Sequence, residues 1–117
     1  MSIALALLLG AVAGPLGCAA WRGAVLYQSG SEALRAGEVQ VAIHDLEEAA
    51  DWMPEASEVQ NHLGLAYAAA GRPDDALRAF RRAEALDCTN HAATLNRQRT
   101  ELALSGAADP GPPEVTQ

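Results

Sequence analysis

The feature that most constrains the fold is a repeat with a period of 34 residues. Adding 34 to a position maps small or apolar residues onto one another: Gly30 onto Gly64, Gly37 onto Gly71, Ala42 onto Ala76, Leu46 onto Phe80 and Ala49 onto Ala83. A period of this length is typical of helical hairpins that stack side by side and present a surface to another protein. The pattern therefore indicates a binding protein and gives no sign of catalysis.

Helix-start and helix-stop signals divide the chain into five expected helices. Gly37 and Gly71 each follow a helical stretch, at a place where the C-cap favours a residue that tolerates positive φ. Pro73 is suited to the first turn of a helix, and Ser57 with Gln60 fits a capping box. Connections this short make neighbouring helices pack antiparallel. We expect helices at residues 23–36, 39–53, 57–70, 73–86 and 90–104.

The second repeat unit carries a specific set of residues, which are Leu63, Gly64, Tyr67, Ala76, Phe80 and Ala83. In this set the chain resembles the tetratricopeptide repeat family. The first unit keeps Gly30, Ala42, Leu46, Ala49 and Pro54, but has Ser29 and Ala33 where the family has large residues. The resemblance implies an all-α fold, a short solenoid with repeats at residues 23–56 and 57–90.

The helix at 91–104 is expected to cap this solenoid. A further shift by 34 places Arg97, Gln98 and Glu101 where the second unit has Leu63, Gly64 and Tyr67. Such polar residues do not bury, so stacking should stop here, while Leu95 and Leu102 cover the preceding hairpin. Trp52 aligns with Leu86 and is expected to pack between the hairpins. Two repeats and a cap are close to the minimum for stable stacking, so we also expect possible self-association.

The resemblance implies a groove for a peptide or a partner helix, lined by the first helix of each hairpin. By position in the repeat, the groove residues would be Tyr27, Ser31, Leu34, Arg35, Glu58, Asn61, Leu65, Ala68, Leu95 and Arg99. We expect Tyr27 and Leu65 to form an apolar floor, and Asn61 and Arg99 to bond peptide carbonyls or a carboxylate. The alternative is that these are ordinary solvent-facing positions.

Residues Ile3 to Ala20 contain no charged side chain, and the run ends in Leu16-Gly17-Cys18. This ending resembles the lipobox of bacterial lipoproteins, which implies cleavage before Cys18 and acylation of that residue. The match departs from the family pattern at Pro15 and Leu16, and no basic residue precedes the run. An uncleaved single-span anchor is therefore the alternative. We expect a signal peptide or anchor at 1–17 and a tether at 18–22.

The remaining composition narrows the possible functions. The net charge is −7 and the chain contains no Lys, which argues against a nucleic acid as partner. His44, His62 and His91 fall on separate expected helices, and no CxxC pair, phosphate loop or Ser/His/Asp grouping is recognisable. We therefore expect no metal, no cofactor and no enzymatic activity. Residues 105–117 are polar and rich in proline, so we expect a disordered tail there.

These expectations combine into a membrane-tethered adaptor or assembly factor of the bacterial cell envelope. Ala19 rather than Asp follows Cys18, which favours the outer membrane, facing the periplasm, in organisms that use this sorting rule. An anchor in the inner membrane is the alternative location. The alternative function is a single-span membrane subunit with a structural role in a larger complex.

Overall fold

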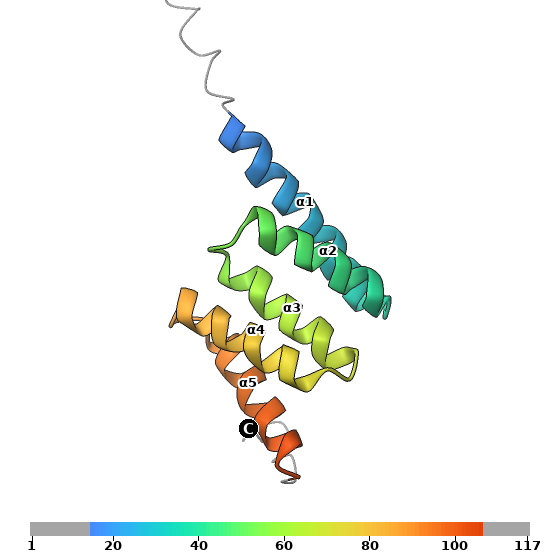
Figure 1. The fold of residues 1–117 in the computed structure, drawn as a ribbon, viewed down its shortest axis with the longest axis vertical. Helices are drawn as coiled ribbons and strands as arrows, with labels where there is room; N and C mark the ends of the chain where they lie inside the picture. The colour runs from blue at the N-terminus through green and yellow to red at the C-terminus, as the bar shows by residue number, and fades with distance from the viewer. Residues whose placement is uncertain (1–14, 107–117) are drawn as a thin grey trace, which may run out of the picture.

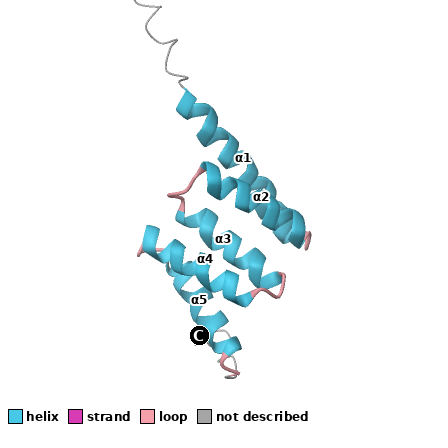
Figure 2. Cartoon of the chain, viewed as in Figure 1, coloured by secondary structure: helices cyan, strands magenta, loops and turns pink. Residues whose placement is uncertain are grey.

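The structure, a computed structural model, describes residues 15–106; the expected apolar segment before residue 15 and the expected tail after residue 106 lie outside the described residues. The described part is entirely helical, as predicted (Figures 1 and 2). Its helices are α1 (Pro15–Arg35), α2 (Val39–Trp52), α3 (Ser57–Ala69), α4 (Pro73–Leu86) and α5 (His91–Leu104). Except at the start of α1, every bound lies within one residue of the expected one.

Helix α1 begins at Pro15, earlier than the predicted start at residue 23. Pro15 occupies the first helical position, where proline is favoured because the missing N–H would have no intrahelical partner. Residues 18–22, expected as a tether, contain alanine and other helix-compatible residues and continue the helix into the first hairpin. In Figure 1, this part of α1 extends beyond the end of α2.

Short connections fold the five helices into a zigzag of antiparallel neighbours (Figure 1). The predicted C-cap glycines are confirmed, because Gly37 has φ of 77° and Gly71 has φ of 72°. Only glycine adopts such values without steric cost, so each helix ends where the next one must reverse direction. Helices α1 and α2 form the first hairpin, α3 and α4 form the second, and α5 packs on α4.

The two hairpins are closed by the same contact, repeated at the 34-residue period. A Cβ atom on Gly30 would lie 2.7 Å from Cγ of Leu46, and a Cβ on Gly64 would lie 2.4 Å from Cε1 of Phe80. Leu46 is fully buried and Phe80 is 1 % exposed. The repeat observed in the sequence is therefore a repeat of one interhelical contact, in which a glycine receives a large side chain.

Ser57 does not cap α3 through its side chain, so the capping-box prediction is wrong. The N-cap of α3 is Ala56, and the buried Ser57 hydroxyl instead donates to the carbonyl oxygen of Ala83 at 2.8 Å. Asn90 donates from Nδ2 to Ser57 Oγ at 2.8 Å, and its Oδ1 accepts from the Ala93 N–H at 3.1 Å as the N-cap of α5. This polar chain joins α3, α4 and α5 at one end of the second hairpin.

The helices are not evenly spaced across the two sides of the stack. Helix α3 contacts both α1 and α5, whereas the backbones of α2 and α4 do not approach one another closely among the described helices. The side formed by α1, α3 and α5 is therefore the contracted side, as in a solenoid that curves toward its first helices. We call it the inner face, and the side formed by α2 and α4 the outer face.

Two packing predictions are corrected by the structure. Trp52 does not pack between the hairpins; it is 41 % exposed and its ring lies 5.2 Å from the guanidinium carbon of Arg22 on α1. Leu95 does not cover the preceding hairpin, since it is 54 % exposed, and Ala93 is the buried contact of α5. Within residues 15–106, no helix is both long enough and apolar enough to cross a membrane.

Candidate partner-binding face

The inner face carries two polar contacts that are equivalent under the repeat. Tyr27 of α1 contacts His62 of α3, with the hydroxyl 3.3 Å from Nδ1 and the rings edge to face at 5.0 Å between centroids. One repeat further along the chain, Asn96 Nδ2 of α5 donates to Asn61 Oδ1 of α3 at 3.0 Å. Each contact joins the first helix of one unit to the first helix of the next.

The hydrogen bonds of His62 define which groups remain available to a partner. His62 Nδ1 lies 3.0 Å from the carbonyl oxygen of Glu58, which can only accept, so Nδ1 carries the hydrogen. The Tyr27 oxygen shares that hydrogen as a second acceptor, which leaves the Tyr27 O–H free to donate. In the neutral imidazole, Nε2 is then an acceptor. The Tyr27–His62 pair thus offers one donor and one acceptor side by side.

Burial, and then the negative charge of Glu58, raise the pKa of the Tyr27 hydroxyl above its ordinary value of 10.0. Both causes disfavour the phenolate, and the positive charge of Arg35 only partly opposes them. Tyr27 is consequently a protonated hydrogen-bond donor throughout the physiological pH range.

The predicted groove residues divide into an accessible and a buried group. Ser31 is 5 % exposed and Asn61 is 4 % exposed, so neither can touch a partner unless the helices separate. Leu34 packs against the core of the first hairpin together with Tyr27, and Leu65 is half-buried. The accessible members are Arg35, Glu58, Ala68, Leu95 and Arg99.

Sequence reasoning missed His62 and Asn96 as members of this face. His62 was interpreted as a surface or cap residue because no metal-ligand spacing includes it. The signal that would have found both is the repeat itself, since Gln28, His62 and Asn96 occupy one position in successive units, each next to a predicted groove residue.

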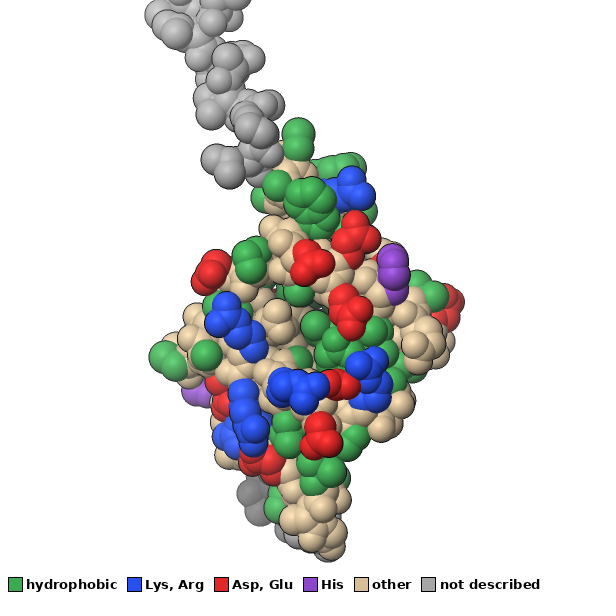
Figure 3. Space-filling model, viewed as in Figure 1, with side chains coloured by type: hydrophobic (Ala, Val, Ile, Leu, Met, Phe, Trp, Pro, Cys, Tyr) green, Lys and Arg blue, Asp and Glu red, His purple; other side chains and the backbone are tan. Residues whose placement is uncertain are grey.

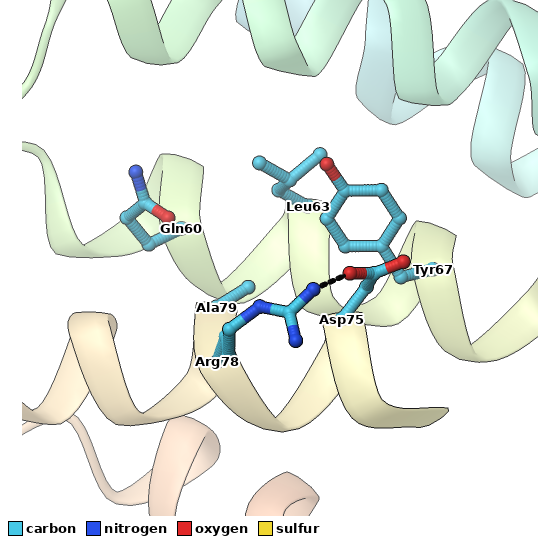
Figure 4. Close-up of a pocket in the computed structure, with 6 residues that line it drawn as sticks. All are labelled: Gln60, Leu63, Tyr67, Asp75, Arg78 and Ala79. Carbon is cyan, nitrogen blue, oxygen red and sulfur yellow. Dashed lines mark hydrogen bonds and ion pairs between the residues drawn. The ribbon is translucent and has the colours of Figure 1, made fainter. Parts of the chain in front are cut away.

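The outer face holds a different set of groups (Figure 4). A hollow of about 260 Å³ is lined by Gln60, Leu63, Tyr67, Asp75, Arg78 and Ala79. The Tyr67 hydroxyl donates to Glu47 Oε1 at 2.5 Å, and Arg72 lies 4.6 Å above the Tyr67 ring. Asp75 accepts from Arg78 and, at 2.7 Å, from Arg72 Nε, so the positive charges around this hollow are already paired.

Charges are unevenly distributed over the surface in view in Figure 3, with acidic side chains over α2 and arginines over α4. The described residues contain no group of three or more His, Cys, Asp or Glu that could hold a metal ion. Cys18 and Cys88 are both exposed and form no disulfide. The described surface therefore presents hydrogen-bonding and apolar groups that suit a polypeptide partner.

Comparison with known proteins agrees with this architecture. The sequence profile described as tetratricopeptide repeat matches residues 27–91, which is more than half of the chain. A search of curated proteins finds no match. Repeats of this family mediate interactions between proteins, as the open inner face requires. The chain belongs to the tetratricopeptide repeat family.

Proposed function

We propose that the protein is a membrane-tethered adaptor or assembly factor of the bacterial cell envelope, and that its inner face binds a peptide or helix of another protein. The observation that carries the binding role is the pair of repeat-equivalent contacts on that face. Tyr27–His62 and Asn61–Asn96 hold α1, α3 and α5 in fixed register. A face held in this way is preorganised, which lowers the entropic cost of binding.

The accessible groups define the partner's chemistry. The Tyr27 hydroxyl donates, His62 Nε2 accepts, and half-buried Leu65 offers an apolar contact between them and the α5 end. Exposed Arg99 supplies one positive charge, and the chain has no Lys to add others. A peptide that pairs main-chain groups and inserts one apolar side chain fits these groups better than a strongly acidic partner. The proposal contains no catalytic step, because the sequence lacks a recognisable nucleophile–base set.

The proposed tether is Cys18, acylated after removal of the first 17 residues. Cys18 is exposed in the first turns of α1, where attached acyl chains meet no steric obstacle from the repeats. Several acyl chains are needed for stable attachment, since one chain binds membranes only marginally. Ala19 after this residue favours the outer membrane as the site of attachment.

A second candidate is a single-span subunit that keeps its apolar segment in the membrane. One observation favours it: α1 runs without interruption through residues 18–22 into the first hairpin. Mass spectrometry of the protein purified from membranes separates the two. An N-terminus at Cys18 with added acyl mass supports the lipoprotein, whereas an intact Met1 supports the single-span subunit.

Site-specific photo-crosslinking in cells tests the inner face directly. A photoreactive amino acid at Ala68 lies on the inner face, and the same amino acid at Ala85 is a matched control on α4, since both alanines are exposed. We expect a discrete protein adduct from position 68 that weakens with Tyr27→Ala and is absent from position 85. Equal adducts at both positions, or none at position 68, would contradict binding on this face.

A further inference from the structure

We propose that one end of the first hairpin rests on the lipid headgroup region of the membrane, with Trp21 and Trp52 as the contact residues. We call this end the tryptophan edge; it consists of Cys18, Trp21, Arg22, Val25 and Trp52. The inference rests on the membrane attachment proposed above and adds how the repeats are held against the membrane. It applies to both a lipidated Cys18 and an uncleaved apolar segment.

The N-terminal turns of α1 expose a stripe of apolar residues to solvent. Cys18, Trp21 and Val25 are spaced three and four residues apart, so they lie on one helical face. Trp21 is 71 % exposed and Val25 is 45 % exposed. With a rise of about 1.5 Å per residue, Trp21 lies about 4.5 Å along the axis from Cys18. The polar region of each leaflet is only slightly thicker than this, about 5–7 Å.

The end of α2 brings the second tryptophan of the chain to the same place. The backbone of Gly23 lies so close to α2 that a Cβ atom there would be 2.5 Å from Met53 Cγ and 3.1 Å from Trp52 Cβ. Arg22 extends across the Trp52 ring, 5.2 Å from its centroid. Both tryptophans of a chain that contains two are thus exposed at one end of one hairpin.

The chemistry of this edge and its place in the chain identify the membrane as its occupant. Tryptophan is favoured at the membrane–water interface, since its ring is apolar and its N–H donates to polar groups. Arg22, with a side chain that is 61 % exposed, is long enough to place its charge among headgroups while its stem stays against apolar atoms. The uncharged run from Ile3 to Ala20 leads directly into this edge.

Acidic residues beside the tryptophan edge limit how deeply it can enter. Glu48 lies 3.4 Å from Arg22, and exposed Asp51 and Glu55 flank Trp52. Moving such carboxylates into hydrocarbon is costly, so the contact must be shallow. The same charges repel anionic lipids, so the contact should weaken as the fraction of anionic lipid increases.

Fluorescence quenching by brominated lipids tests this contact in the full chain reconstituted into phosphatidylcholine vesicles. Trp52→Phe leaves Trp21 as the sole indole, and Trp21→Phe leaves Trp52. We expect both variants to show blue-shifted emission that bromines near the headgroup quench more strongly than bromines near the chain end. Replacing part of the lipid with phosphatidylglycerol should reduce the quenching of Trp52.

A matched control carries Trp21→Phe, Trp52→Phe and Leu104→Trp, which moves the indole to the half-exposed end of α5. This indole should remain unquenched. If the protein floats with the vesicles but Trp21 is quenched no more than the control, the tryptophan edge is refuted while the tether stands. If the protein does not float at all, the tether itself fails, and the edge fails with it.

Discussion

The α-carbon of Gly64 lies so close to the Phe80 ring that a methyl group there would be 2.4 Å from Cε1. Phe80 is 1 % exposed and has no space into which it can move. Gly64→Ala should therefore destabilise the fold by about 1–3 kcal/mol, although alanine is the better helix former by about 1 kcal/mol. Urea unfolding followed by circular dichroism measures the difference.

A second substitution shows whether overcrowding is the cause. Phe80→Leu removes the ring atoms that the new methyl group would meet, at the cost of a cavity. If overcrowding is responsible, Gly64→Ala combined with Phe80→Leu will be more stable than the sum of the single effects implies. Simple additivity would argue against the contact as the origin.

Asn90 combines two roles that substitutions can separate. Its Oδ1 caps α5, and its Nδ2 donates to the buried Ser57 hydroxyl. Asn90→Ala removes both and should cost about 2–4 kcal/mol, the sum of a cap of about 1 and an unsatisfied buried group of about 1–3. Asn90→Asp keeps a capping acceptor but loses the donor, so its cost should be intermediate at pH values where Glu58 is charged.

The control for this experiment is in the same turn. Thr89 bonds only to Asp87 on the exposed side, with its hydroxyl 2.6 Å from Oδ1. Thr89→Ala should change the free energy of unfolding by no more than about 0.5 kcal/mol. An effect as large as that of Asn90→Ala would mean that the turn, and not the buried bond, determines stability here.

Tyr67 makes the protein sensitive to alkali. Burial, followed by the hydrogen bond to Glu47, raises the pKa of Tyr67 from 10.0 to about 12. Between these values the unfolded chain loses the proton before the folded chain does, so unfolding releases a proton and stability falls as pH rises. This contribution is complete below about pH 10 and is lost by about pH 12.

Tyr67→Phe should flatten this part of the stability profile, as measured by melting temperature at pH values from about 8 to about 12. Ultraviolet absorbance of the phenolate identifies which tyrosine titrates last. Tyr27→Phe serves as the matched variant, since Tyr27 also has a raised pKa but lies on the inner face. An unchanged alkaline slope in Tyr67→Phe would contradict the assignment.

Polar residues on α5 stop the stack from growing. Arg97 donates to Glu84 at 2.8 Å and to Glu101 at 2.7 Å, at positions where the preceding unit has apolar Leu63 and aromatic Tyr67. Arg97→Leu with Glu101→Tyr restores a surface on which another hairpin can pack. Light scattering should then show concentration-dependent self-association.

The matched control makes the same two replacements at exposed sites away from α5, as Arg82→Leu with Glu55→Tyr. It has the same composition and net charge as the test variant. If both variants associate equally, general hydrophobicity is responsible and α5 does not act as a cap.

Most of the fold could be predicted because its signals are local or periodic. The glycines at positive φ, Gly37 and Gly71, ended helices where expected, and the 34-residue period located the contact of Gly64 with Phe80. The start of α1 was missed although Pro15 gives the same signal as Pro73, because the apolar run was interpreted as a leader.

The errors concern side chains whose partners are distant in sequence. Ser57 has the residue type and spacing of a cap, but its hydroxyl finds a better acceptor on α4. Trp52 aligns with a packing residue of the second unit, yet Arg22 of α1 takes its ring instead. His62 has no recognisable motif, so only its contact with Tyr27 shows that it belongs to the inner face. Local patterns do not determine such pairings.

The contact between a glycine and a large side chain, present once in each hairpin, makes the architecture modular. Gly30 with Leu46 and Gly64 with Phe80 fix the distance within each hairpin independently of its neighbour. A tandem duplication of residues 57–90 would consequently introduce no new kind of interface. The length of the inner face can thus change in whole hairpins, by a genetic event that leaves every existing helix pair as it is.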